Sequence, residues 1–215
     1  MTRRLFASLP LVLGASMTTC FLFVAVAHDW LSPYSVEQMD MAHRLALPSA
    51  AHWFGADNFG RDLGTRLAYG ASVSLSVALG TVAMSGLVGT CVGMVAGFAG
   101  GATDMVLMRV ADVFLGFPTL VLAMAIIAAL GPGPVHLALA LAAVFWTQYA
   151  RVARAAMLAE RGRDYVAAAR AVGAGPVRVV LRHVLPNCMG PVLVLATLQA
   201  GSVVVETAGL SFLGL

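Results

Sequence analysis

An uncharged run of 37 residues extends from Leu67 to Thr103. In a typical soluble domain about a quarter of the residues are charged, so runs of this length are not expected. Here 11% of the residues are charged and 60% are hydrophobic. About 20 apolar residues in a helix suffice to cross a bilayer core of about 30 Å. The sequence therefore predicts an all-α, polytopic membrane helical bundle.

Five membrane spans are predicted. For the first, Leu5–Ala27, a secretory signal peptide cleaved after Ala25-Val26-Ala27 is an alternative, but the apolar part of a signal peptide usually has only about 7–15 residues. Its 23 uncharged residues favour a retained span. The run from Leu67 to Thr103 exceeds the length of one span, so part of it is expected to be loop or interfacial segment. The other four predicted spans are Ser72–Phe98, Val113–Leu130 with a kink at Pro118, Val135–Ala150 and Asn187–Val205.

The arginines predict the orientation of these spans. All 13 basic residues are arginine, and seven of them lie between residues 151 and 183, against the two acids Glu160 and Asp164. Cytoplasmic loops carry the excess of basic residues, so this loop, about 159–185, and the N-terminus with Arg3 and Arg4 are expected in the cytoplasm. Acids outnumber arginines in residues 28–66, which suits an external loop with Trp30, Trp53 and Tyr69 at the membrane interface. The predicted division is residues 1–70, the first span and external loop, and 71–215, the transmembrane domain.

Three further patterns predict how individual side chains pack or pair. Gly89, Gly93, Gly97 and Gly101 recur every four residues and predict a groove for close helix packing. Arg109 and Asp112, three residues apart, are placed to form an ion pair on one helix. The three cysteines all lie in apolar runs, which is typical of small buried hydrophobic residues and not of disulfides; they are Cys20, Cys91 and Cys188.

The segment Asp164–Pro186 is the longest polar, arginine-bearing interval between two apolar spans of the C-terminal half. Its pattern predicts two short helices. Asp164 is expected to cap the first and Gly173 to end it in a left-handed conformation. Pro176 begins the second helix. This second helix is expected to have one apolar face, formed by Val177, Val180, Leu181 and Val184, with Arg178 and Arg182 on another.

No motif in the sequence predicts catalysis, a metal site or a cofactor. A phosphate-binding loop of the G-x-x-x-x-G-K-[ST] kind is absent, and the five histidines do not form an H-E-x-x-H motif. The arginines lie at the ends of apolar spans and do not form a basic face, which argues against binding of nucleic acid. The sequence therefore does not predict an enzyme.

Five motifs, in order, resemble the shorter permease subunit of the bacterial dipeptide, oligopeptide and nickel ABC importers. The resemblance extends from about His52 to Leu215. It implies a multi-pass protein of the inner membrane with the type I importer (MetI-like) permease fold, in which a cytoplasmic coupling helix docks on the ATPase. The motifs are HWFGADNFGRDLGTRLAYGASVSL, GFAGGATDMVLMRVADVFLGFPTLVLAMAI, YARVARAAML, DYVAAARAVGAGPVRVVLRHVLPN and ETAGLSFLGL.

The resemblance also implies partners and site residues. The partners would be a second permease subunit, cytoplasmic ATP-binding subunits, an external substrate-binding protein and membrane lipid. Two departures from the family are expected to matter. Ala167 stands where the family usually has glutamate, and the sequence stops at Leu215, where the family continues into a sixth span. The residues expected to couple the permease to the ATPase are Asp164, Ala167, Ala168, Ala169, Gly173 and Arg178.

A secondary transporter or channel subunit is the alternative function. Such a protein needs ionisable groups inside the membrane as ion relays. The candidates are Asp112, His136 and Glu206, and all three are predicted near the ends of spans. The sequence therefore favours the ATP-driven importer. The resemblance implies that its substrates are di- or oligopeptides or a small solute such as nickel.

Overall fold

The computed structural model describes residues 2–214, and the side chains from Leu9 onward. Arg3 and Arg4, on which the predicted orientation of the N-terminus rests, therefore lie outside the described side chains. The chain divides into two compact units, Met1–Ser76 and Val77–Leu215. The described residues form helices, turns and one isolated bridge between Ala56 and Asp62, as the predicted all-α class requires.

The first unit contains α1 (Thr2–Val26), α2 (His28–Leu31), the short 3-10 helix η1 (Met41–His43) and the beginning of α3 (Leu63–Ala99). Asp57 organises the loop before α3: it accepts hydrogen bonds from the N–H groups of Phe59 and Arg61 and pairs with the guanidinium groups of Arg61 and Arg66. Desolvation raises the pKa of Asp57, but these hydrogen bonds outweigh it and lower the pKa to about 2. The loop is therefore ordered by its own polar contacts.

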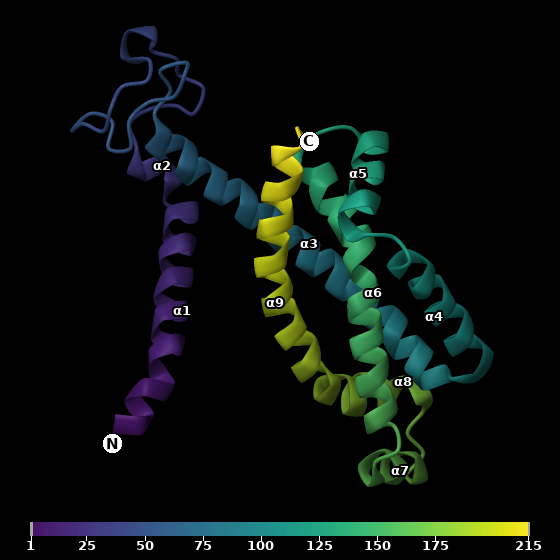
Figure 1. Cartoon of the computed structure of the whole chain (residues 1–215). Helices are drawn as coiled ribbons and strands as arrows, with labels where there is room; N and C mark the ends of the chain where they lie inside the picture. The colour runs from purple at the N-terminus through teal and green to yellow at the C-terminus, as the bar shows by residue number, and fades with distance from the viewer. Residues whose placement is uncertain (1, 215) are drawn as a thin grey trace. The chain divides into compact units, whose positions relative to one another are not determined.

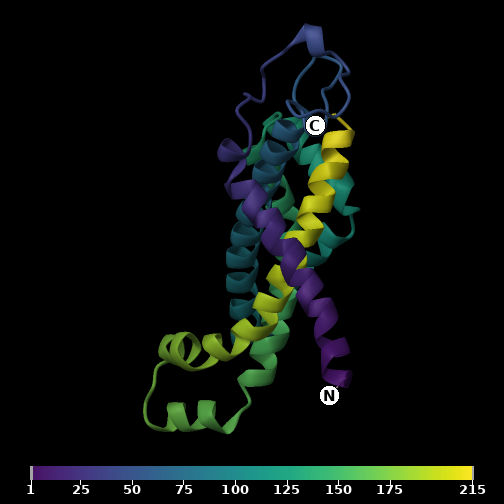
Figure 2. The same ribbon diagram turned by 90° about the vertical axis from the view of Figure 1, so that its left-hand side faces the viewer.

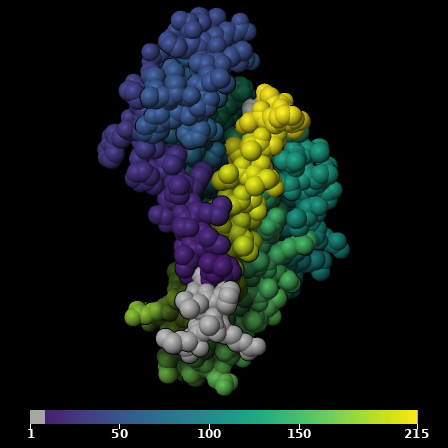
Figure 3. Space-filling model, turned by 60° about the vertical axis from the view of Figure 1, so that its left-hand side comes forward, coloured from purple at the N-terminus to yellow at the C-terminus, as the bar shows by residue number. Residues whose placement is uncertain are grey.

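The second unit contains the rest of α3 and a bundle around α6 (Figure 1). α6 contacts α4, α5 and α9. Of its most apolar stretch 56% is buried, compared with 28% for α3 and 22% for the helix from Pro176 to Phe212. The C-terminal turns of α9 lie beside α5 (Figure 3). The elements are α4 (Gly101–Leu115), α5 (Thr119–Leu130), α6 (Pro134–Glu160), α7 (Asp164–Ala171), α8 (Pro176–Val179), η2 (Val180–Val184) and α9 (Leu185–Phe212).

Among the described residues, four helices are long and apolar enough to span a membrane, and a fifth span results if α4 and α5 count as one. Two predicted boundaries are wrong. α3 is a single helix of 37 residues, so the predicted loop within Leu67–Thr103 is limited to Gly100, which has a positive φ. The last span begins earlier than predicted, because the helix from Pro176 runs without a break to Phe212.

The predicted third span, Val113–Leu130, is not one helix with a kink. α4 ends at Leu115 and α5 begins at Thr119, and the two helices are bent by 89°. Pro118 lacks an N–H donor and disfavours helical geometry at Phe117, so the chain cannot continue its hydrogen bonds through this point. The interruption is therefore a corner and not a kink.

The predicted glycine groove is confirmed on α3, where it faces α6. A Cβ atom added at Gly89 or Gly93 would collide with backbone carbonyl oxygens of α6, and one added at Gly97 would lie 2.7 Å from Cγ of Met157. The two backbones approach so closely that a methyl group does not fit. Gly101 does not belong to this groove, because it lies in α4 with open space around it.

A cluster of buried side chains joins the ends of α3, α6 and α9 to α7 and α8. It contains Cys188, so the prediction of a buried cysteine is confirmed there, whereas Cys20 and Cys91 are exposed. The buried members are Met94, Tyr149, Ala153, Met157, Val166, Val179, Val184, Cys188 and Val192.

Candidate coupling segment

The six predicted coupling residues all lie on the segment from α7 to α8, which leaves α6 and returns to the long C-terminal helix (Figure 2). Ala169 is half-buried, and the other five are exposed. Val172, in the turn, is 86% exposed. The segment thus presents small and apolar groups to its surroundings at the end of the bundle where α3 ends. The exposed predicted residues are Asp164, Ala167, Ala168, Gly173 and Arg178.

The prediction that Asp164 caps α7 is wrong. Arg163 occupies the N-cap position, and its carbonyl oxygen accepts hydrogen bonds from the N–H groups of Val166 and Ala167 at 3.0 and 3.3 Å. The helix has therefore already begun at Asp164, whose carboxylate makes no capping hydrogen bond. As an acid in the first turn, Asp164 still has a favourable interaction with the helix dipole.

The left-handed end of α7 at Gly173 is confirmed, with φ of +84°. The N–H of Gly173 donates to the carbonyl of Arg170, and the N–H of Ala174 donates to the carbonyl of Ala169, each at 3.0 Å. This pair of hydrogen bonds is a Schellman motif, which favours glycine because a side chain is strained at positive φ. Ala169 and Ala174 both pack against the buried cluster, so the turn is fixed to the bundle.

The predicted apolar face of the second helix is only half right: Val184 is buried and Val180 packs against the buried cluster, but the other two members are exposed. Val177 and Leu181 are 70% and 59% exposed, whereas Val179 and Val184 are fully buried. The reason is the π-helical turn η2, in which hydrogen bonds join residues five apart. Residues 179 and 184 then lie on one face, which a period of 3.6 residues does not predict.

Two side chains fix α7 and α8 to the bundle. Val166 of α7 and Val179 of α8 are 1% and 0% exposed, and both belong to the buried cluster with Met94 and Met157. The segment is therefore anchored on one side by side chains that contact α3, α6 and α9, while its other side is exposed.

A hydrogen-bond network that the sequence did not predict ties α7 to its neighbours. The hydroxyl of Tyr165 donates to Glu160 Oε2 at 2.6 Å and accepts from Asn187 Nδ2 at 3.1 Å. Burial and the hydrogen bond to Glu160 raise the pKa of Tyr165, so the phenol remains a donor at neutral pH. The sequence signal for this network was only a tyrosine and an asparagine in the segment, and their separation of 22 residues follows no helical period.

The acids of α4 pair with α6 and not with Arg109, so the predicted Arg109–Asp112 pair is wrong. Asp112 accepts from Arg151 Nη2 at 2.7 Å, and Asp104 accepts two hydrogen bonds from Arg154. These arginines lie one helical turn apart on α6 and face α4, which lies alongside. Two ion pairs thus hold α4 to α6.

The candidates for an ion relay are placed differently from one another. Asp112 is in the ion pair with Arg151, and His136 Nδ1 lies 3.2 Å from the carbonyl oxygen of Gly131. Glu206 is half-buried, and its Oε2 has no hydrogen-bond partner within the described part of the chain. Within residues 2–214, no group of three histidine, cysteine, aspartate or glutamate side chains is placed to hold a metal ion.

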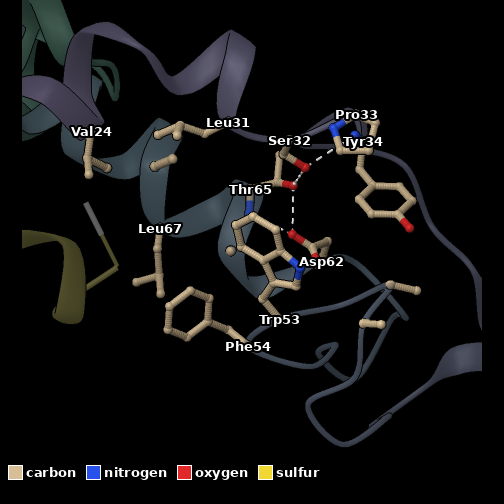
Figure 4. Close-up of a pocket in the computed structure, with 14 residues that line it drawn as sticks. Val24, Leu31, Ser32, Pro33, Tyr34, Trp53, Phe54, Asp62, Thr65 and Leu67 are labelled. Atoms are coloured by element: carbon tan, nitrogen blue, oxygen red, sulfur yellow. Dashed lines mark hydrogen bonds between the residues drawn. The ribbon is translucent and has the colours of Figure 1, made fainter.

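The first unit contains a cavity of about 490 Å³ between the end of α1 and the loop that precedes α3 (Figure 4). Ser32, Thr65 and Asp62 lie together on its wall: the hydroxyls of Ser32 and Thr65 are 2.5 Å apart, and Thr65 donates to Asp62 at 2.7 Å. Asp62 also lies 2.9 Å from His52 Nδ1. These polar groups hydrogen-bond one another, and most of the remaining wall is apolar.

Known proteins resemble the chain along nearly all of its length. The family described as binding-protein-dependent transport system inner membrane component matches residues 89–215. The dipeptide transport system permease of Alkalihalophilus pseudofirmus is 38% identical over 204 residues, which is 95% of this chain and 67% of the relative. The di/tripeptide permease of Pseudomonas aeruginosa is 40% identical over 94% of this chain and 69% of its own length.

A nickel transport system permease of Escherichia coli strain K12 is 38% identical over 89% of this chain and 69% of its own length. The family match covers the glycine groove, the coupling segment and the C-terminal helix. With these relatives and several helices of membrane-spanning length, the chain belongs to the binding-protein-dependent inner-membrane components, the permeases of ABC importers.

Proposed function

We propose that this permease couples ATP hydrolysis by a separate ATPase to alternating access, and that the segment from α7 to α8 is its docking element. The supporting observation is the two-sided character of this segment. Val166 and Val179 are anchored in the buried cluster, while Ala167, Ala168 and Val172 are exposed. A force applied at the exposed side would move the ends of the helices to which the buried side is packed.

The small exposed residues suit a docking role because they leave the backbone of α7 accessible to a concave partner. The segment lies in the arginine-rich interval, so we place it in the cytoplasm together with the N-terminus. A second permease subunit would complete the transport path, and an external binding protein would deliver the substrate. The relatives are named for dipeptides, tripeptides and nickel, so we propose a substrate of one of these classes.

Substitution of Gly173 by proline tests this function. Proline fixes φ near −65° and removes the N–H that donates to Arg170, so the Schellman motif cannot form. We expect loss of co-purification with the ATPase and loss of transport, with unchanged insertion into the membrane. The matched control is Gly175→Ala, because Gly175 has φ of −65° and open space around its Cβ position. Unchanged co-purification of the proline variant would refute the coupling assignment.

The half-buried Glu206 is the one observation that favours a secondary transporter or channel. Such a protein moves its substrate without an ATPase, and Glu206→Gln would stop this movement. For the proposed importer, we expect that transport by the complete complex depends on ATP, and that vesicles containing the permease alone accumulate no substrate. Accumulation by the permease alone, lost in Glu206→Gln, would establish the alternative.

A further inference from the structure

An apolar groove lies where the end of α3 meets the start of the long C-terminal helix. Its volume is about 200 Å³, and its walls are Met94, Val95 and Phe98 from α3 and Val177, Val180 and Leu181 from the other helix. Val95, Val177 and Leu181 are each more than half exposed. Both helices are long and apolar enough to span a membrane. The groove is therefore an apolar surface that no side chain from Leu9 to Gly214 fills.

Arginines without acidic partners flank this groove. The guanidinium carbon of Arg170 lies 5.9 Å from the ring centroid of Phe98, a residue of the groove wall. Arg178 and Arg182 are exposed on the helix that contributes Val177 and Leu181. Within the described part of the chain none of these three arginines is in an ion pair, whereas Arg151, Arg154 and Arg163 each are.

The acids of this region do not offset that charge. Glu160 is engaged by Arg163 and by the hydroxyl of Tyr165, and Asp164 is exposed at the start of α7. Five arginines between residues 161 and 182 stand against these two carboxylates. The region thus combines an excess of positive charge with an apolar groove, and its ligand must be both anionic and apolar.

We propose that the groove binds an anionic phospholipid of the inner leaflet, with an acyl chain against the walls from α3 and the long helix and the phosphate near Arg182 and Arg170. A basic pocket between membrane helices on the cytoplasmic side is suited to such headgroups. Burial of the exposed apolar walls by an acyl chain is favourable because it removes them from water. The residues of this site differ from Ala167, Ala168 and Val172, the exposed residues proposed to meet the ATPase, and both sites lie on the segment from α7 to α8.

The purified permease without any ATPase is the material for the test. We would titrate it in a neutral detergent with dioctanoyl phosphatidylglycerol, dioctanoyl phosphatidylcholine and inorganic phosphate, and count bound lipid by native mass spectrometry. The wild-type protein should bind phosphatidylglycerol at least about fivefold more tightly than phosphatidylcholine, because each arginine near an anionic surface contributes about 1 kcal/mol. Inorganic phosphate should compete only weakly, since it cannot occupy the apolar groove.

Variants locate the site. The double change Arg170→Gln and Arg182→Gln should lower the affinity for phosphatidylglycerol at least about fivefold and leave that for phosphatidylcholine unchanged. Val177→Trp, which fills the groove, should weaken the binding of both lipids. The matched control is Arg44→Gln, because Arg44 is also exposed but lies in the loop of the first unit, and it should have no effect.

Equal binding of the two lipids by the wild-type protein would overturn the proposal, as would an equal loss in Arg44→Gln. Displacement of the lipid by an equal concentration of phosphate would also overturn it, because the site would then bind a free anion. The lipid site rests on the proposed function only for its cytoplasmic placement. Lipid binding by a protein that fails to co-purify with the ATPase would contradict the coupling role alone.

Discussion

The α3–α6 contact and the turn between α7 and α8 both depend on glycine, for opposite physical reasons. On α3 the backbone of Gly93 is helical, and the space for a side chain is taken by the carbonyl group of Ala150. At Gly173 the space is open within 4 Å, and the backbone has φ of +84°. One position excludes a side chain by volume and the other by conformation.

This difference separates the rigid part of the permease from the part proposed to transmit motion. Two helices in backbone contact along Gly89, Gly93 and Gly97 can move only together. The α7–α8 turn is attached through a few buried side chains and hydrogen bonds, so its geometry can be altered without separating the helices. Substitutions should therefore affect stability most at the α3–α6 contact and coupling most at the turn.

The largest effect on stability is expected for Gly93→Ala. Its methyl group would collide with the backbone of α6 at Ala150, and backbone atoms cannot rotate away as a flexible side chain can. We expect a loss of about 1–3 kcal/mol or more in the free energy of unfolding, as for other overpacked interiors. Thermal unfolding in detergent measures it. Gly70→Ala on the same helix has open space and is the control; equal losses would mean that the close contact does not form.

Val166→Ala should have the next largest effect. Val166 is 1% exposed in the buried cluster, and truncation leaves a cavity where α7 is anchored, for which we expect a loss of about 1–3 kcal/mol. Val172, six residues further, is 86% exposed, so Val172→Ala should change stability by less than about 0.5 kcal/mol. Unfolding midpoints of the two variants, measured side by side, test whether the segment is anchored on the α7 side.

The sequence predicted the class of the molecule and the turns better than the contacts between elements. Apolar length identified the spans, and glycine or proline identified the breaks at Gly173 and Pro176, because these signals are local. The corner at Pro118 was predicted as a kink. Proline alone interrupts the helical hydrogen bonds, but the neighbours of α4 and α5 decide how far the axis turns.

Contacts between distant residues were predicted poorly. Arg109 was expected to pair with Asp112 because the two are near in sequence, but Arg151 lies closer in space. With the π-helical turn of η2, Val179 is buried together with the predicted Val184, whereas Val177 and Leu181 of the expected face are exposed. In both cases the packing of other helices decides the outcome, and a periodic pattern within one helix carries no information on that packing.

Gly173→Ala tests whether backbone conformation, and not volume, requires glycine at the turn between α7 and α8. The added methyl group meets no atom within 4 Å, so the cost should come from the left-handed backbone alone, about 1 kcal/mol. Gly173→Asn should cost less, because asparagine adopts this conformation more readily. Unfolding measurements on both variants test the order. If the larger asparagine is the more damaging of the two, volume and not conformation governs the turn.

Ala167→Glu should have the smallest effect on stability and the most informative effect on coupling. Ala167 is exposed in the second turn of α7, and glutamate is nearly as good a helix former as alanine, so stability should change by less than about 0.5 kcal/mol. The carboxylate introduces the residue that the resemblance to the importer permeases leads us to expect at this position. We therefore expect co-purification with the ATPase to be retained or strengthened. Ala167→Gln has nearly the same size without the charge, so it should strengthen association with the ATPase less than Ala167→Glu does. A clear loss of association in the glutamate variant alone would mean that the exposed side of α7 meets an acidic surface, so that this chain docks differently from its relatives.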